Sequence, residues 1–205
     1  AALNRHKDPS LIYDTNIDLV SKLIDSLNRT KSIPHVIMSS SSQEDNDNLY
    51  GKSKKIGRSL FVEWAKEKNA VFTGMLIPNV FGPFGKPNYN SVVATFCEQL
   101  SNSKTPKIDI DGQLKLIYVG ELVTLIIDHI VKKTNEIEYK VNPTSEAKVS
   151  ELLMLLKNFK ELYQNNGEIP ILKNVFELNL FNTFRCYMDI KNYFPVKFTK
   201  YNDAR

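Results

Sequence analysis

Short apolar runs alternate with amphipathic helical segments through the first part of the chain. Residues 12–28 and 51–68 repeat apolar side chains at the spacing of one helix face. Each segment is followed by a short apolar run, over 35–38 and 71–77. Apolar runs of this length that alternate with helices pair as parallel strands buried on both faces. The order therefore predicts an α/β fold built on a Rossmann-type parallel sheet.

The rest of the chain continues this alternation and then becomes mainly helical. We expect residues 1–145 to form a domain around this sheet, and residues 146–205 to form a smaller, mainly helical cap. The later elements are a helix over 91–100, a strand over 114–119, a helix over 121–132, a strand over 138–141, and helices over 149–163 and 175–187.

The composition argues against several classes of protein. The 27 basic and 23 acidic residues give a net charge of only +4, without a lysine run interleaved with aromatics, so nucleic-acid binding is not expected. No apolar stretch has the length of a membrane span. Cys97 and Cys186 are too few for a disulfide framework, which favours a reducing, cytoplasmic location. His6, His35 and His129 are scattered without ligand spacing, so we expect no metal site.

Tyr50 and Lys54 form the candidate catalytic pair. They lie four residues apart in a predicted helix, so their side chains share one face. A lysine ammonium beside a phenol favours the phenolate, and such a tyrosine can give a proton to a carbonyl oxygen during hydride delivery. The lysine can also hold ribose hydroxyls of a nicotinamide cofactor. The spacing is common by chance, so the pair needs support from its surroundings.

A run of serines distinguishes this pair from two others with the same spacing. Tyr187/Lys191 and Tyr193/Lys197 also lie four residues apart, but no serine loop precedes them, and we interpret both as structural. Ser39–Ser42 follows the first apolar run, at the carboxyl end of a strand, where ligands bind in open parallel sheets. A serine hydroxyl there can polarise the carbonyl that the tyrosine protonates. Alternatively, the serines form a flexible loop or cap the next helix.

The segments that carry these residues resemble the extended short-chain dehydrogenase/reductases, which include epimerases, dehydratases and reductases of sugar nucleotides. The likeness begins with the strand-end serines and Tyr50–Lys54. It continues through Pro78–Pro83, which taken alone indicates a turn or a backbone contact for a nicotinamide. Lys86–Cys97 narrows the likeness to the reductase domain of capsular polysaccharide assembling proteins of the CapF and WbjC type. It covers nearly the whole chain and weakens after about Lys148.

The resemblance implies that residues 1–145 are the C-terminal part of a Rossmann-type cofactor and catalytic domain with interleaved substrate-binding segments, and that residues 146–205 are a small, mainly helical substrate-binding cap. It also implies NADPH as the hydride donor, with NADH as the alternative, and a homodimer through the helices 12–28 and 51–68. It implies reduction at C4 of a UDP-linked 2-acetamido-2,6-dideoxy-hexos-4-ulose in capsule or surface polysaccharide biosynthesis. The catalytic residues that it implies are Ser41, Tyr50 and Lys54. The cofactor-binding residues are Asn4, Arg5, Tyr50, Lys54, Pro78, Asn79 and Val80, and the substrate-binding residues are Ser42, Gln43, Asn79, Lys86, Asn88, Asn90, Ser91 and Thr95.

The chain departs from the family pattern at several positions. No glycine occurs before Gly51, so the glycine-rich loop that cradles the cofactor pyrophosphate is absent from this sequence, together with the first strands. Leu76 replaces a frequent arginine, and Gly120-Glu121 replaces paired aspartates. Relatives continue into a metal-binding cupin domain, which we do not find here, so no epimerase activity or metal is assigned. We therefore expect this sequence to be a piece of a longer protein.

Two alternative functions stay open. The first is a sugar-nucleotide epimerase or 4,6-dehydratase of the same fold. A dehydratase commonly needs an acidic residue beside the catalytic serine, and Gln43 is neutral there, although Glu44 and Asp45 follow. We therefore favour reduction over elimination. The second alternative is a non-catalytic module that binds a sugar nucleotide and has lost its cofactor loop.

Overall fold

The computed structural model describes residues 2–189, and the chain divides into two compact units. The first comprises Ala1–Val80 and Leu114–Glu146, and the second comprises Phe81–Gln113 and Ala147–Arg205. The second unit therefore takes residues from both sides of position 145. The predicted division into a cofactor and catalytic domain with interleaved substrate-binding segments over 1–145 and a helical cap over 146–205 stays a prediction.

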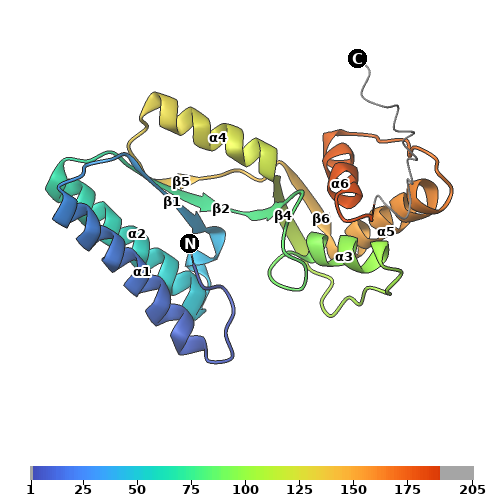
Figure 1. Ribbon diagram of the computed structural model, residues 1–205, viewed down its shortest axis with the longest axis horizontal. Helices are drawn as coiled ribbons and strands as arrows, with labels where there is room; N and C mark the ends of the chain where they lie inside the picture. The colour runs from blue at the N-terminus through green and yellow to red at the C-terminus, as the bar shows by residue number, and fades with distance from the viewer. Residues whose placement is uncertain (1, 190–205) are drawn as a thin grey trace, which may run out of the picture. The chain divides into compact units, whose positions relative to one another are not determined.

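A parallel sheet of the order β1-β2-β5 forms the centre of the first unit (Figure 1). The helices that connect its strands follow the predicted alternation, so the predicted α/β fold with a parallel sheet is confirmed. The elements of this unit are α1 (Pro9–Thr30), β1 (Val36–Ser41), the 3₁₀ turn η1 (Ser42–Asp45), α2 (Leu49–Lys68), β2 (Phe72–Ile77), β4 (Gln113–Tyr118), α4 (Val119–Lys132) and β5 (Glu136–Lys140).

Helices cover both faces of this sheet, with α1 and α2 on one face and α4 on the other (Figure 1). Successive strand residues point to opposite faces, so each apolar run supplies two cores. The core beneath α1 and α2 contains Phe61, Trp64 and Phe72. The core beneath α4 is built from Met75, Ile77, Ile117, Leu122 and Val141.

Side-chain caps explain where the first two long helices begin. The Asp8 side chain accepts a hydrogen bond from the Ser10 backbone N–H, and Pro9 occupies the first position of α1. The helix therefore starts three residues earlier than the predicted position 12. Asn48 caps α2 in the same way, through a 2.7 Å bond from the Gly51 N–H.

Three of the four consecutive serines lie in a strand, which corrects the prediction of a serine loop. Ser39, Ser40 and Ser41 pair in parallel register with Met75, Leu76 and Ile77 of β2. Only Ser42 lies beyond the strand, at the start of η1. Small hydroxyl side chains are tolerated here because their backbone groups belong to the sheet ladder.

The second unit is mainly helical in its described part. It contains α3 (Val92–Ser101), α5 (Val149–Phe159), the π-helical turn η2 (Lys160–Asn165) and α6 (Val175–Arg185). Its core is lined by fully buried apolar side chains that include Leu152, Leu156, Leu180 and Phe184. A second sheet of three short strands, most of whose residues belong to the first unit, has the order β3-β4-β6, where β3 is Asn79–Phe81 and β6 is Ser145–Lys148. Neither β3 nor β6 was predicted as a strand. Within residues 2–189, no helix combines the length and apolar character that crossing a bilayer requires.

Candidate active site

The first turns of α2 lie against the carboxyl end of β1. The Lys54 ammonium donates a 2.6 Å hydrogen bond to the backbone carbonyl of Ser39. Gly51 lies so close to η1 that an added Cβ would be 2.0 Å from the carbonyl oxygen of Gln43. Any other residue at position 51 would push the helix away from the serines, so the glycine sets this close approach. The structure therefore brings the predicted tyrosine–lysine helix to the predicted serine strand end.

Tyr50 and Lys54 share one face of α2, as their spacing predicted. The Lys54 Nζ lies 6.0 Å from the centre of the Tyr50 ring. Lys54 is buried, and this burial lowers the pKa of its ammonium, whereas the nearby Glu44 carboxylate acts in the opposite direction. Tyr50 is half-buried. The pair therefore places a held cation close to the tyrosine ring.

Ser41, Ser42 and Gln43 surround the point where β1 ends. The Ser41 hydroxyl accepts a 3.2 Å hydrogen bond from the Gln43 backbone N–H and so caps η1. The side chains of Ser42 and Gln43 are exposed. The alternative prediction that a serine caps the next helical segment is thus correct for Ser41. Its hydroxyl hydrogen remains available to a ligand, because the oxygen acts here as an acceptor.

Asn16 is a buried residue of this region that the sequence analysis missed. Its side-chain amide donates to the Leu3 carbonyl and to the Ser53 hydroxyl, both at 3.0 Å, and its oxygen accepts from the Leu3 N–H. Ser53 in turn donates to the carbonyl of Tyr50 at 2.8 Å. One amide therefore joins the segment before α1 to the first turn of α2. Its helical position gave no signal, since its partner Ser53 lies 37 residues away.

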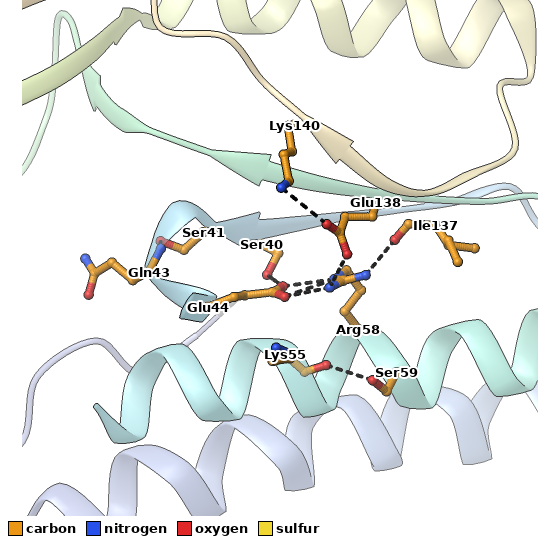
Figure 2. Close-up of polar contacts among 10 residues, drawn as sticks. All are labelled: Ser40, Ser41, Gln43, Glu44, Lys55, Arg58, Ser59, Ile137, Glu138 and Lys140. Atoms are coloured by element: carbon orange, nitrogen blue, oxygen red, sulfur yellow. Dashed lines mark hydrogen bonds and ion pairs between the residues drawn. The ribbon is translucent and has the colours of Figure 1, made fainter. Parts of the chain in front are cut away.

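Glu44 and Arg58 are also site residues that the sequence analysis did not identify as such. Figure 2 shows the Glu44 carboxylate between the Ser40 hydroxyl and the Arg58 guanidinium. Only 2% of the Glu44 side chain and 10% of the Arg58 side chain are exposed. From the sequence, Glu44 was considered only as an acidic residue near Gln43, and its burial follows from a partner 14 residues further along the chain.

Besides Tyr50 and Lys54, the predicted cofactor-binding residues lie in two separate stretches of the first unit. Pro78 is buried after β2, and the next two residues, Asn79 and Val80, are exposed. The Asn79 amide donates a 3.3 Å hydrogen bond to the Lys115 carbonyl. Near the start of the chain Arg5 is exposed, whereas the Asn4 side-chain oxygen is buried without a hydrogen-bond partner among the described residues. Of these groups, the Lys54 ammonium fits a cofactor ribose, because it has N–H donors besides the one that bonds the Ser39 carbonyl.

The predicted substrate-binding residues after Gly85 form one folded loop of the second unit. The Asn88 backbone N–H donates to the Thr95 hydroxyl at 2.9 Å, and Thr95 donates to the Ser91 carbonyl at 2.8 Å. Ser91 caps α3, and its hydroxyl accepts from Ala94. Lys86 and Asn90 are exposed, and the Lys86 ammonium lies 5.2 Å from the centre of the Tyr89 ring. The loop thus presents an ammonium, amides and an aromatic ring to solvent.

An apolar cavity of about 310 Å³ lies beside Lys54 in the first unit. It is open along the edge of β1, which has a strand neighbour on one side only among the described residues. The aliphatic stem of Lys54 forms part of its wall, so the ammonium reaches the serine strand end from an apolar surface. The other lining residues are Leu19, Val20, Leu23, Val36, Ile37, Met38, Ser39 and Phe61.

Several predictions fall outside what the structure describes or tests. Lys191, Tyr193 and Lys197 of the two other tyrosine–lysine pairs lie beyond residue 189. Within residues 2–189, no three histidine, cysteine, aspartate or glutamate side chains gather in a way that could hold a metal ion. The catalytic, cofactor-binding and substrate-binding roles remain predictions for the residues named above.

Comparison with known proteins identifies the family. Residues 2–141 match the model of the NAD dependent epimerase/dehydratase family. A UDP-2-acetamido-2,6-beta-L-arabino-hexul-4-ose reductase from Pseudomonas aeruginosa is 27% identical over 162 residues, which are 78% of this chain and 44% of the relative. The crystal structure of the capsular polysaccharide assembling protein CapF from Staphylococcus aureus has a TM-score of 0.77 and 31% identity, over 85% of this chain and 49% of CapF.

More distant structures share the fold alone. RMD from Pseudomonas aeruginosa, solved with NADPH, has a TM-score of 0.75 at 16% identity. This chain spans about half the length of CapF and less than half of the reductase. The predicted resemblance to the extended short-chain dehydrogenase/reductases of the CapF type is confirmed by these matches. The chain belongs to the NAD dependent epimerase/dehydratase family.

Proposed function

We propose that this chain is the catalytic part of an enzyme that reduces a nucleotide-linked 4-keto-6-deoxy sugar with a nicotinamide cofactor. The substrate would be of the UDP-2-acetamido-2,6-dideoxy-hexos-4-ulose type, and the product would serve capsule or surface polysaccharide biosynthesis. The reaction named for the Pseudomonas relative and the likeness to CapF support this choice. The observation that carries it is the placement of Tyr50 and Lys54 at the serine end of β1.

Each residue of this set has a separate task. The Ser41 hydroxyl would donate a hydrogen bond to the ketone oxygen and polarise it. Tyr50 would give its phenolic proton to the same oxygen as negative charge develops there. The Lys54 ammonium, 6.0 Å from the ring centre, stabilises the phenolate that remains. When bound, the nicotinamide cofactor supplies the hydride for the ketone carbon.

The burial of Glu44 is an argument for reduction and against dehydration. Elimination of water needs an acidic side chain that can exchange a proton with the sugar. The Glu44 carboxylate accepts from Ser40 and Arg58 and is only 2% exposed, so it is not available for that task. Asp45, the last residue of η1, is exposed and stays the acidic alternative. A 4,6-dehydratase is therefore the weaker alternative.

We propose NADPH as the hydride donor, with NADH as the alternative. Lys54 and the region of Asn79, Val80 and Asn4 would hold its nicotinamide-ribose end. The oxidation of each cofactor can be followed by the loss of the near-ultraviolet absorbance of the reduced nicotinamide, in the full protein with the keto sugar present. A tenfold or greater preference in kcat/KM, corresponding to about 1.4 kcal/mol, would decide between them.

The Tyr50→Phe variant tests the proposed function. Removal of the phenolic proton should lower kcat by about 10²–10⁴-fold and leave the affinity for the sugar nucleotide unchanged. Tyr139→Phe is the matched control, because this half-buried tyrosine packs against His129 beneath α4. The result that contradicts the proposal is turnover by Tyr50→Phe at the wild-type rate. Sugar-nucleotide binding without turnover in the wild-type protein would instead support the non-catalytic module.

We also propose that the protein is a homodimer that pairs through α1 and α2. These helices pack side by side on one sheet face and expose Leu11 (43%), Leu23 (48%) and Ile56 (37%). Exposed apolar side chains on neighbouring helices favour burial against a second copy. Sedimentation equilibrium should give twice the monomer mass, and Ile56→Glu should weaken the association. A monomer at all concentrations would overturn this part of the proposal.

A further inference from the structure

The Arg58 guanidinium joins three elements of the first unit through one set of hydrogen bonds. Its Nε and Nη2 donate to the two Glu44 carboxylate oxygens of η1 at 3.0 and 2.7 Å. Its Nη1 donates to the Ile137 carbonyl of β5 at 3.0 Å, and Nη2 also reaches the Glu138 carboxylate at 3.0 Å (Figure 2). Such a bidentate pair fixes direction as well as distance, because the guanidinium is planar.

Room for this arrangement comes from Gly74 on β2. A Cβ at this position would lie 2.7 Å from the Arg58 Cδ and 2.6 Å from the Ile137 carbonyl oxygen. The strand face beneath α2 thus lacks one side chain, and the Arg58 side chain lies in the space that this leaves. A residue with a side chain at position 74 would therefore collide with this hydrogen-bond network.

The Glu44 carboxylate passes this constraint to the serine strand end. Its second partner is the buried hydroxyl of Ser40, which donates to it directly. Ser40 stands between Ser39, whose carbonyl accepts from Lys54, and Ser41, whose hydroxyl caps η1. A shift of Glu44 would move all three serines at once, because they are consecutive residues of one strand end.

The same arginine also fixes the helix that carries the tyrosine and the lysine. Tyr50, Lys54 and Arg58 follow each other at intervals of four along α2 and therefore lie along one face. Anchoring Arg58 to η1 and β5 restrains the rotation of α2 about its axis, and with it the direction of the other two side chains. The pair thus acts on both halves of the proposed catalytic set.

We propose that the buried Glu44–Arg58 ion pair positions the strand-end serines relative to Tyr50 and Lys54, and that catalysis depends on it. This inference rests on the proposed function and assigns neither residue a contact with substrate. A buried ion pair adds little net stability compared with apolar residues of the same size, because desolvation offsets the attraction. Its contribution here is geometric, since a misplacement of about 1 Å in an active site can cost roughly 10²-fold in rate.

The decisive variant replaces both charges, as Glu44→Gln with Arg58→Met, in the full protein. It leaves no unpaired buried charge, so the melting temperature should stay near that of the wild type. We expect kcat to fall by roughly 10²-fold, while KM for the sugar nucleotide changes little. Arg58→Lys is the second variant. It keeps the positive charge but replaces three hydrogen-bonded nitrogens with one ammonium, so its kcat should also be lower than that of the wild type.

A readout that needs no turnover is the side-chain ammonium signal of Lys54 in nitrogen-15 NMR spectra, assigned with Lys54→Arg. The hydrogen bond to Ser39 protects this group from exchange with solvent, and the protection should be lost in both variants. Glu138→Gln is the matched control, because it removes a contact to the same guanidinium that does not touch the serines. We expect it to retain kcat and the Lys54 signal.

The outcomes separate the two proposals. A doubly substituted protein that is folded and keeps both wild-type kcat and the protected Lys54 signal overturns the positioning role. If Tyr50→Phe retains turnover, the proposed function is wrong, and the NMR measurement still decides whether the pair positions Lys54. Loss of the Lys54 signal in the double variant, with an unchanged signal in Glu138→Gln, supports the inference.

Discussion

The Lys54 ammonium is tied to the backbone carbonyl of Ser39 by a hydrogen bond of 2.6 Å. This contact joins a helix side chain to the strand end that precedes it by 15 residues. It holds a positive charge in a mostly buried position beside an apolar cavity. Because burial disfavours the charged form, the contact has a consequence for how the stability of the protein varies with pH.

The first prediction concerns Lys54→Met. Burial lowers the pKa of the folded-state ammonium below its ordinary value of 10.5, so the folded protein releases this proton at a lower pH than the unfolded chain. Between the lowered pKa and 10.5 the unfolded chain binds more protons, and stability rises with pH. The free energy of unfolding of the wild type relative to Lys54→Met should therefore increase through this alkaline window.

Urea unfolding at several pH values, followed by circular dichroism, measures this difference. Lys55→Met serves as the control, because Lys55 is the exposed neighbour on the same helix and its loss changes the formal charge equally. A wild-type curve that runs parallel to that of Lys54→Met throughout the alkaline range would contradict the prediction.

The second prediction compares Gly74→Ala with Gly112→Ala. The added methyl at position 74 would meet Arg58 Cδ at 2.7 Å and the Ile137 carbonyl oxygen at 2.6 Å, whereas nothing lies within 4 Å at position 112. Gly74→Ala should lower the free energy of unfolding by about 1–3 kcal/mol, as overpacking does. Gly112→Ala should leave it unchanged or raise it by about 0.4–1 kcal/mol. Equal unfolding midpoints for the two variants would show that Arg58 is not confined as described.

The third prediction concerns Asn16→Ala. The substitution removes three hydrogen bonds and leaves the Leu3 N–H and the Ser53 hydroxyl without this partner. Unpaired buried polar groups cost about 1–3 kcal/mol each, so denaturant unfolding should shift to lower concentrations by a corresponding amount. Asn165→Ala is the control, because its amide bonds an exposed glutamate within its own turn. Equal losses of stability in the two variants would show that the buried hydrogen bonds of Asn16 do not stabilise the fold.

The fourth prediction concerns Tyr187→Phe in the second unit. The Tyr187 hydroxyl donates to the Gly85 carbonyl at 2.6 Å, and burial, with a smaller influence from Cys97 and Cys186, raises its pKa from 10.0 to about 12. The folded state therefore holds this proton at pH values at which the unfolded chain has released it. The resulting stability is present below pH 10.0 and is lost as the pH rises toward about 12.

The wild type should accordingly lose stability relative to Tyr187→Phe between these two pH values, as measured by urea unfolding at alkaline pH. Tyr89→Phe removes a hydroxyl from the loop of the same unit and is the control. If the wild-type and Tyr187→Phe curves stay parallel across this range, the hydroxyl does not keep its proton in the way the structure indicates.

The sequence predicted those parts of the fold that repeat along the chain. The apolar spacing of residues 12–28 and 51–68 identified α1 and α2, and the runs 35–38 and 71–77 identified β1 and β2. The ends of these elements were less accurate, because a cap such as Asp8 or a strand of serines does not change apolar periodicity. The strands β3 and β6 were missed because they have only 3 and 4 residues.

The site was predictable only where its residues are neighbours in sequence. Tyr50 and Lys54 are four apart, and a helix is sufficient to place them on one face. Asn16, Glu44 and Arg58 owe their burial to partners on other elements, at separations of 37 and 14 residues. A polar side chain in a helix or loop looks the same in the sequence whether its partner is water or a distant group.

The open edge of β1 beside the apolar cavity also affects how this polypeptide behaves in isolation. Unpaired backbone groups along an edge strand can pair with a strand of another chain, and an apolar cavity next to them favours such contacts. When this stretch is produced alone, it should therefore form aggregates that grow with concentration and that short peptides of matching β-propensity suppress.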